Sequence, residues 1–379
     1  MTMHNYAEIF TPGEFLKDEL EARNWSQTEF AEIIGRPVRL INEIIAGKRS
    51  ITPETAIQFS ASLGTSAELW MNLESQFQLS KVTSTDSLIE RKAKLYANFP
   101  VRELIRRGWV SGSDDIEILE QQFLQFYCIS TLDEEPHLAH AAKKTTYGEA
   151  TSILQESWLF RVKHLAKSFV LPEFNRDSLI KNLPNIQALQ TAPEECRHVA
   201  KYLNEAGVRF VLVEALAGSK IDGACLWLSE NQPVIAMSSR LDRIDNFWFV
   251  LRHEIEHVLL GHGKEGAMLD IDIGESNESE PEEEILANAA ASQFGVNNAE
   301  LQGYMARVNP YFFARDRVLG FAARLKIHPG IVIGRLQKTL DKQNYPDAYK
   351  YLRDYLVKVR QFVMQSAPTD GWGNVFPVK

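Results

Sequence analysis

Between residues 12 and 80, helix start and stop signals recur at intervals that allow only short helices. Ser26 caps one helix, Glu29 three residues later completes a capping box, and Gly35 ends that helix. Pro37 then suits the first turn of the next helix. The predicted helices read PGEFLKDELEARNW, QTEFAEII, PVRLINEIIAG, PETAIQFSASLG and SAELWMNLESQFQL. Short helices with a tight glycine-containing turn between the second and the third are typical of a helix-turn-helix.

The same segment resembles antitoxins and regulators of the HigA branch of the Xre/Cro family. Over about 11–78 it carries PGE, SQTEFA, AGKR, ITPETA and LGTSAELWMNLE, where that family has PGE, SQxELA, NGKR, ITxxTA and LGTSxxxWxNLQ. The resemblance implies a homodimer that binds palindromic operator DNA, with the last helix contributing to the dimer interface. Val38 and Leu40 depart from the family, because they replace basic residues in the helix that reads DNA.

The second helix of a helix-turn-helix enters the major groove, where its first residues contact base edges. Arg39 and Asn42 suit hydrogen bonds to bases, whereas Val38 suits only a thymine methyl group. The predicted DNA-contacting residues are Gln27, Arg36, Val38, Arg39, Asn42, Lys48 and Arg49. The alternative is a helical bundle that binds protein. Residues 1–80 hold six Lys or Arg against eleven Asp or Glu, and this net charge of −5 predicts weak non-specific DNA binding.

The whole chain, at 379 residues, exceeds one ordinary hydrophobic core and predicts two or three domains. After a mainly helical stretch, strand patterns begin at Gly207 and read VRFVLVEAL, GACLWLS and PVIAMSS. Helical patterns return from about Arg243. An acidic segment at 270–284 is expected to be mobile, and the tail from Gln365 is expected to be loose. The predicted fold class is therefore α+β and mainly helical.

Composition narrows the location and the partners. The net charge of −9 argues against indiscriminate nucleic-acid binding, although it leaves room for a local DNA-reading module. No apolar run approaches the roughly 18 residues needed to span a bilayer. The N-terminus lacks a signal-peptide pattern, and the three cysteines form no CxxC pair. We therefore expect a cytoplasmic protein without a membrane partner.

The stretch FVLRHEIEHVLLGH, residues 249–262, places two histidines four positions apart with a glutamate directly after the first. Residues four apart on a helix point the same way, so His253 and His257 can bind one zinc ion. Glu254 comes next round the helix, where it can reach a water molecule at that ion. An apolar stripe that would pack on a core comprises Ile244, Phe247, Leu251, Ile255 and Val258. The alternative is a buried helix whose histidines are only structural.

A zinc hydrolase needs three protein ligands and one open position. Downstream, the pattern EEEILANAAASQF predicts an alanine-rich helix that can pack closely on the first. Of its glutamates only Glu284 shares a face with Asn288 and Ala291, so Glu284 is the predicted third ligand. His262 lies past Gly261, which should end the helix, and a structural or supporting role is favoured for it.

FWFVLRHEIEHVLLGH followed by EEEILANAAASQF resembles the ImmA/IrrE family of zinc metallopeptidases. That family combines His-Glu-x-x-His with a later Glu-x-x-Ala-Asn-x-x-Ala, and the resemblance covers about 205–340. It implies that Zn²⁺ is bound by His253, His257 and Glu284. It also implies that Glu254 is the catalytic general base, acting while the metal polarises the scissile carbonyl.

Two positions depart from the ImmA/IrrE pattern. Arg252 stands where a small residue is usual, and Glu256 replaces a common glycine. Neither is a ligand position, but Arg252 bears on substrate access or local charge. The residues considered as donors to a developing oxyanion are Arg252, His262 and His328.

Together the two resemblances imply a regulator that joins DNA binding to zinc-dependent proteolysis. The predicted domains are a helix-turn-helix domain at 1–80, a helical middle region at 81–205, a small-sheet, zincin-like metallopeptidase domain at 206–340, and a C-terminal helix with a loose tail at 341–379. We expect the peptidase to cleave a repressor or other regulatory protein, or the chain's own linker near 81–100, and so to relieve repression. The alternative is a non-catalytic HigA-like antitoxin or repressor, whose metallopeptidase-like domain senses a ligand or holds a cognate toxin.

Overall fold

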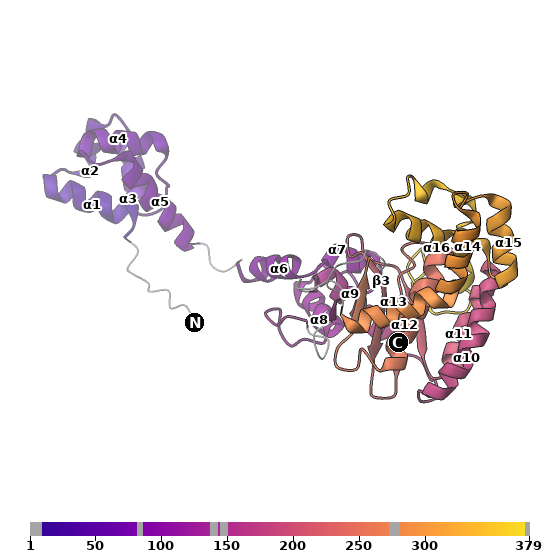
Figure 1. The fold of residues 1–379 in the computed structure, drawn as a ribbon. Coiled ribbons are helices and arrows are strands. Elements are labelled where there is room, and N and C mark those ends of the chain that lie inside the picture. Colours follow the sequence, from indigo (N-terminus) through magenta and orange to yellow (C-terminus); the bar gives the residue numbers. More distant parts are fainter. Residues whose placement is uncertain (1–9, 82–85, 137–142, 145–150, 273–280, 376–379) are drawn as a thin grey trace. The chain divides into compact units, whose positions relative to one another are not determined.

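The chain forms two compact units, residues 1–91 and 92–379. The computed structural model describes residues 10–81, 86–136, 143–144, 151–272 and 281–375. Figure 1 shows the helices and strands of both units. The domain boundaries expected near 80, 205 and 340 separate parts of the chain that would fold independently. The division into two compact units does not test independent folding, so these boundaries stay predictions.

Five short helices fill residues 12–81, as predicted (Figure 1). They are α1 (Pro12–Arg23), α2 (Gln27–Ile33), α3 (Val38–Ile45), α4 (Pro53–Leu63) and α5 (Ala67–Lys81). The capping box of α2 is confirmed: the Ser26 hydroxyl accepts from the Glu29 amide at 3.2 Å, and the Glu29 carboxylate accepts from the Ser26 amide at 2.7 Å. Pro37 is the N-cap of α3 rather than part of its first turn, because its ψ of 135° is extended.

Aromatic side chains hold the helices of the N-terminal unit together. Phe59 lies between Trp70 and Phe30, with ring centroids 5.1 Å and 5.3 Å away, and all three side chains are fully buried. Packing of this kind contributes through buried apolar area and through edge-to-face ring contacts. Since Phe30 belongs to α2, this core fixes the first helix of the helix-turn-helix to the rest of the bundle.

The larger unit is also mainly helical. Its first helices are α6 (Asp86–Asn98), which spans the division between the units, α7 (Val101–Arg106), α8 (Ile116–Tyr127), α9 (Ile153–Lys167), α10 (Arg176–Ala188), α11 (Val199–Glu205) and the 3-10 helices η1 (Leu189–Thr191) and η2 (Pro193–His198). Its later helices are α12 (Ile244–Leu260), α13 (Glu282–Gly295), α14 (Asn298–Val308), α15 (Arg315–Leu325), α16 (Pro329–Lys342), α17 (Arg360–Val363) and the 3-10 helices η3 (Ala348–Lys350) and η4 (Arg353–Tyr355). Within the described residues, none of the helices combines the length and the apolar character needed to cross a bilayer.

Among the described residues, a mixed sheet of six strands lies within the larger unit, in the order β1-β5-β3-β4-β2-β6. The strands are β1 (Lys143–Lys144), β2 (Arg209–Val213), β3 (Ile221–Trp227), β4 (Pro233–Met237), β5 (Met268–Ile271) and β6 (Thr369–Asp370). β3 runs antiparallel to β4 and β5, whereas β2 is parallel to β4 and β6. The predicted strands β2 to β4 and the mainly helical fold class are confirmed.

Helices cover both faces of this sheet. Phe210 and Leu212 of β2 belong to a core shared with α12, while Val211 and Val213 belong to a core shared with α8 and α9. In Figure 1, α9 and α12 accordingly lie on different sides of β3. Because both faces are buried, the strands read as nearly continuous apolar runs. α12 packs against β3, β4, α13 and α16, which places the predicted zinc helix deep inside the unit.

The prediction of a loose tail from Gln365 is wrong for the described part of that tail, which reaches residue 375. β6 pairs with β2, with Val213 opposite Asp370. The buried Asp370 carboxylate accepts hydrogen bonds from Trp109 Nε1 at 2.8 Å and Arg161 Nε at 2.9 Å. The tail composition is polar and glycine-rich, which typifies a loop, but β2 and Arg161 supply partners from far away in the sequence.

The acidic segment at 270–284 is described only at its two ends, because 273–280 lie outside the described residues. Asp270 belongs to β5 and Glu284 to α13, and their exposed fractions are 0% and 1%. The expectation of a mobile segment is therefore wrong at these ends, where pairing with β3 and packing on α12 bury the chain.

Candidate metal centre and DNA-facing helices

α12 carries the predicted metal-binding histidines inside the larger unit. It begins after Arg243 and ends at Gly261, whose φ of 74° provides a left-handed C-cap. The predicted apolar stripe is buried throughout, at Ile244, Phe247, Leu251, Ile255 and Val258. His253, Glu254 and His257 also have no exposed surface. Three buried polar side chains on one helix require compensating partners, because an uncompensated buried polar group is costly.

α13 brings Glu284 to the two histidines. Glu284 Oε2 lies 3.2 Å from His253 Nε2, and Glu284 Oε1 lies 3.4 Å from His257 Nε2. Ala287 and Ala291 are buried, and their small side chains let α13 approach α12 closely. The structure therefore brings together the three residues predicted as zinc ligands.

Asp270 joins these residues from β5 and was missed by the sequence analysis. Its Oδ2 lies 3.3 Å from His253 Nε2. Met268 and Asp270 are two positions apart on a strand and so share a face, while Leu269 points to the other core. The available signal was the Met-Leu-Asp-Ile alternation, which fits a short strand, but the surrounding acidic residues hid it.

The four side chains match the requirements of a zinc ion. One ligand atom from each of His253, His257, Asp270 and Glu284 lies within 4.8 Å of all the others. The closest separation is 3.0 Å, between the two histidine Nε2 atoms. Ligands at 2.0–2.1 Å from a tetrahedral zinc ion stand about 3.3 Å apart. Two imidazoles and two carboxylates therefore suit zinc in donor type, number and spacing.

The charges of this cluster favour a bound cation. Burial disfavours a charged His253, but the charges and hydrogen bonds of Asp270 and Glu284 outweigh that effect and raise its pKa to about 10. Burial lowers the pKa of His257 to about 3, with the neighbouring histidines adding to the effect of burial. Burial also disfavours a charged Asp270, yet the two imidazoles hold its pKa below the usual range. Without a metal ion, the charged His253 therefore compensates part of the carboxylate charge, and a zinc ion would take over that role by displacing the His253 proton.

Glu254 lies against the same cluster. Burial and the charge of Asp270 raise the pKa of its carboxyl group well above the ordinary value. Gly223 of β3 leaves the space for it, because a Cβ at that position would overlap Glu254 Oε1 and lie 3.0 Å from Val250 Cγ1. Gly223 also lies opposite Asp270 in the sheet. A glycine within a strand pattern was the only sequence signal for this close approach.

The candidate oxyanion donors lie in different places. His262 Nδ1 is 3.0 Å from His257 Nδ1, a position from which it can orient that imidazole. Arg252 forms an ion pair with Glu256 at 2.6 Å, so the two departures from the ImmA/IrrE pattern contact each other. His328 is the N-cap of α16, where its Nδ1 accepts from the Gly330 amide at 3.1 Å.

The predicted DNA-contacting residues lie on and around α2 and α3. Those with exposed side chains are Gln27, Arg39, Asn42, Lys48 and Arg49. Val38 instead packs against the core of the N-terminal unit. Arg36 is partly buried, and it bonds Gln58 Oε1 at 2.9 Å and Glu54 Oε1 at 2.9 Å. Five of the seven predicted positions are thus exposed, and all seven remain predictions as DNA contacts.

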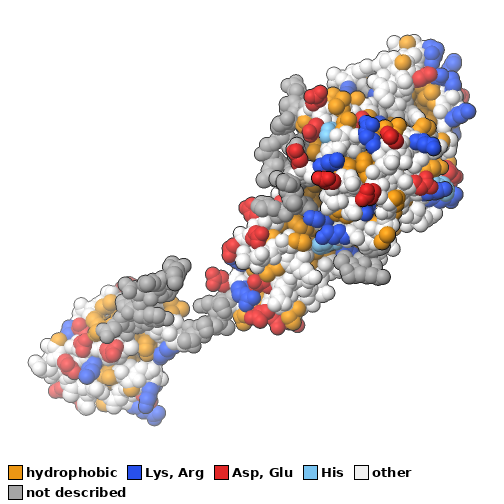
Figure 2. Space-filling view, turned by 90° about the horizontal axis from the view of Figure 1, so that it is seen from below, with side chains coloured by type: hydrophobic (Ala, Val, Ile, Leu, Met, Phe, Trp, Pro, Cys, Tyr) orange, Lys and Arg blue, Asp and Glu red, His pale blue; other side chains and the backbone are white. Residues whose placement is uncertain are grey.

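Glu43 forms ion pairs with two of the exposed arginines, Arg39 and Arg49. Glu43 Oε1 lies 2.7 Å from Arg39 Nε, and Glu43 Oε2 lies 3.3 Å from Arg49 Nη1. The hydrogen bond from Arg39 lowers the pKa of Glu43. On the face of the N-terminal unit seen in Figure 2, acidic and basic side chains are interspersed. Exposed ion pairs contribute little free energy, so DNA phosphates can replace Glu43 at small cost.

Comparison with known proteins assigns the N-terminal unit. The helix-turn-helix family matches residues 16–70. The uncharacterized HTH-type transcriptional regulator YddM of Escherichia coli (strain K12) is 31% identical over 74 residues, which is 20% of this chain and 79% of YddM. Through this region the chain belongs to the helix-turn-helix family of transcriptional regulators. The matched domain is of the Xre type and is HigA-like.

Solved structures similar to this region include two antitoxins. The Pseudomonas aeruginosa antitoxin HigA, solved with the higBA promoter, is 33% identical over 19% of this chain and 78% of its own, with a TM-score of 0.18. A HigA-family addiction module antidote protein from Coxiella burnetii is 29% identical over 23% of this chain and 89% of its own, with a TM-score of 0.19.

Proposed function

We propose that the protein is a DNA-binding transcriptional regulator whose larger unit is a zinc-dependent peptidase. One observation carries the second half of this proposal: four buried ligand atoms from His253, His257, Asp270 and Glu284 cluster with zinc-like spacing directly beside Glu254. The resemblance of the sequence around this cluster to the ImmA/IrrE family supports the same activity. The substrate would be a regulatory protein or the chain's own linker near 81–100.

In the proposed reaction, different residues of the cluster would bind the metal ion and transfer the proton. His253, His257, Glu284 and Asp270 would hold zinc, which supplies positive charge and polarises a peptide carbonyl. Glu254 would accept a proton from the attacking water and return it to the leaving amine. The space above Gly223 keeps the Glu254 carboxylate beside the cluster. Burial of the whole group excludes bulk water and strengthens each electrostatic contact.

The position of Asp270 favours a second candidate function. Catalytic zinc sites keep one position open, whereas structural sites are closed by four protein ligands. With Asp270 at 3.3 Å from His253 Nε2, this chain offers four ligands instead of the three predicted. A closed site would make the larger unit a ligand-sensing or toxin-binding scaffold in a HigA-like antitoxin or repressor.

Zinc content tests the feature that both candidate functions share, which is a bound zinc ion. Purified full-length protein is expected to retain about one zinc ion per chain after dialysis, and His257→Ala to bind zinc more than about 100-fold more weakly. The measurement is elemental analysis together with the rise in unfolding temperature on zinc addition. His198→Ala, which removes a partly exposed histidine of η2, is the control and should match the wild type. Equal zinc content in His257→Ala and wild type would rule out the site.

For the N-terminal unit, we propose binding to palindromic operator DNA as a homodimer. Membership in the helix-turn-helix family and the exposed Arg39 and Asn42 on α3 support this part of the proposal. α3 would enter the major groove, with Lys48 and Arg49 near phosphates.

A matched pair of arginine and lysine variants tests the DNA-binding surface. Arg39 on α3 and Lys17 on α1 are both exposed and both face a glutamate four residues later. Arg39→Ala is expected to weaken binding to the chain's own promoter DNA by about 1–3 kcal/mol, because base and phosphate contacts are lost. Lys17→Ala should bind like the wild type. Mobility-shift titrations at fixed salt measure both, and equal losses in the two variants would contradict the assignment of α3.

A further inference from the structure

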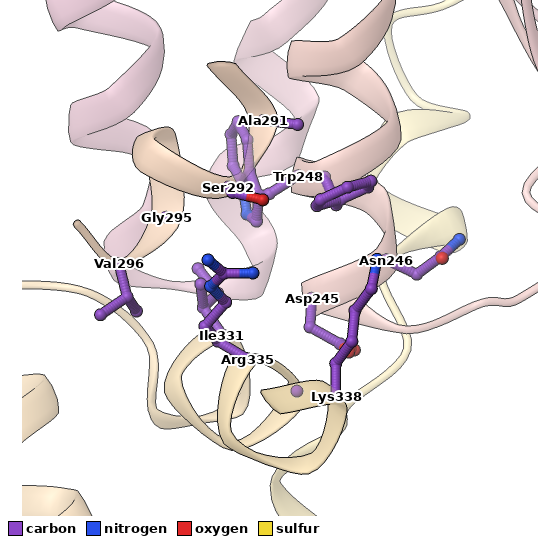
Figure 3. Close-up of a pocket in the computed structure, with 12 residues that line it drawn as sticks. Asp245, Asn246, Trp248, Ala291, Ser292, Gly295, Val296, Ile331, Arg335 and Lys338 are labelled. Atoms are coloured by element: carbon purple, nitrogen blue, oxygen red, sulfur yellow. The ribbon is translucent and has the colours of Figure 1, made fainter. Parts of the chain in front are cut away.

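A cavity of about 260 Å³ lies where α9, the turn between β3 and β4, and the loop after α12 meet. It is larger than the cavity of about 110 Å³ that Figure 3 shows between α12, α13 and α16, where Trp248 and Arg335 are part of the lining. An apolar cavity of about 150 Å³ takes up benzene, so the larger space can hold a molecule of several carbon atoms. None of the candidate metal ligands lines it, so it is separate from the proposed metal centre.

The wall around Lys163 of α9 is largely apolar. Lys163 lines the cavity together with Leu226, Leu228 and Ala267, and of these Leu226 and Ala267 are 3% and 5% exposed. Lys163 itself is partly buried, and it forms no hydrogen bond or ion pair with the described residues. One helical turn later α9 carries a second cation, Lys167. Partial desolvation and a neighbouring cation both disfavour the protonated form of an amine.

These surroundings lower the pKa of Lys163. Burial has the largest effect, the positive charge of Lys167 adds to it, and the nearby Cys128 thiol opposes both more weakly. The lining includes one carboxylate, Glu230, which is exposed at the turn between β3 and β4 and forms no ion pair within the described part of the chain. A larger share of Lys163 is therefore the neutral, nucleophilic amine than for an exposed lysine.

A second amine, Lys264, lines the cavity from the loop between α12 and β5. Its Nζ lies 4.6 Å from the centroid of the Trp227 ring, and this cation–π contact favours the charged form. The indole is fixed in turn, because Trp227 Nε1 donates to the His262 carbonyl oxygen at 2.7 Å. Gly263 lets the loop approach β3 closely, since a Cβ there would lie 2.7 Å from the Cys225 carbonyl oxygen. The cavity thus contains a nucleophilic amine and a separate, stable cation.

We infer that Lys163 forms a Schiff base with a small aldehyde that carries a carboxylate, and that Lys264 binds this carboxylate. A lysine that is desolvated or lies next to another cation is the kind that forms Schiff bases with carbonyl compounds. The Lys163 nitrogen would bond to the aldehyde carbon, and the aldehyde oxygen would leave as water with the two protons of the neutral amine. The product is an imine, and no oxidant or reductant takes part. The charge-assisted contact with Lys264 would favour an anionic aldehyde over a neutral one.

Reductive trapping on the full-length protein tests this inference. Succinic semialdehyde, a short aldehyde with a carboxylate, is added with sodium cyanoborohydride, which reduces the imine to a stable secondary amine. Peptide mass spectrometry then gives the initial labelling rate of each lysine. Lys163 is expected to be labelled about tenfold faster than Lys167, which is exposed on the same helix. Equal rates at the two lysines, or a faster rate at Lys167, would overturn the inference.

Butanal, which lacks the carboxylate, tests the role of Lys264. The preference for Lys163 over Lys167 should be about threefold larger with succinic semialdehyde than with butanal, an effect ordinary for an exposed ion pair. Lys264→Gln should remove this difference between the aldehydes. Lys201→Gln is the matched control and should retain it, because Lys201 is also exposed and lies 5.8 Å from the centroid of a tyrosine ring, but does not line the cavity. Circular dichroism checks that both variants are folded. An equal preference with the two aldehydes in the wild type, or an undiminished difference in folded Lys264→Gln, would reject the anionic aldehyde as the ligand.

Discussion

Glu254→Gln is expected to bind zinc like the wild type and to lose peptide cleavage by a factor of about 10²–10⁴. General acid–base groups contribute rate factors of that size, and an amide cannot accept the proton. The measurement is release of an N-terminal fragment, or cleavage of an added partner protein, after incubation with zinc. Glu256→Gln is the matched control, because Glu256 lies on the same helix but pairs with Arg252 instead of the cluster.

The outcomes of this comparison separate the two candidate functions. If wild type and Glu256→Gln cleave while Glu254→Gln does not, the peptidase proposal stands. Cleavage by Glu254→Gln at the wild-type rate would contradict the role of Glu254. Full zinc content without cleavage of either the linker or a partner would instead favour the closed, four-ligand site with Asp270.

Asp370→Asn is expected to lower the free energy of unfolding of the larger unit by about 3–5 kcal/mol, since it leaves a buried guanidinium without its counter-charge. Arg161 and Asp370 are 0% and 1% exposed, and the same carboxylate accepts the Trp109 indole N–H. Chemical denaturation monitored by circular dichroism measures the loss. Asp354→Asn, an exposed aspartate of η4, is the control and should change stability by less than about 0.5 kcal/mol. A loss below about 1 kcal/mol in Asp370→Asn would show that the pair is not a structural requirement.

Local signals explain which parts of the fold were predictable. The capping box of Ser26 and Glu29 and the glycine turn at Gly35 act within a few residues, so they predict helices directly. His253 and His257 likewise share a helix. Glu284 could be predicted because it is the one glutamate of its helix that shares a face with Asn288 and Ala291. These features depend on helical geometry alone.

Long-range pairing explains what was missed. Asp270 is buried only because β5 pairs with β3, and an acidic residue inside an acidic run gives no local sign of that. Asp370 depends on Arg161, 209 residues earlier in the chain. Trp248 and Arg335 border one cavity only after α12, α13 and α16 have packed together. In each case the contact that buries the residue joins segments far apart in the chain, and neither local sequence indicates that the two segments pair.

The Arg161–Asp370 pair also implies an order of folding during synthesis of the chain. A ribosome that adds about 5–20 residues per second makes Asp370 roughly 10–40 s after Arg161. The capping box of α2, by contrast, joins residues only three positions apart. We therefore expect the larger unit of a nascent chain to remain incomplete until Asp370 has been synthesised, long after the residues of the helix-turn-helix.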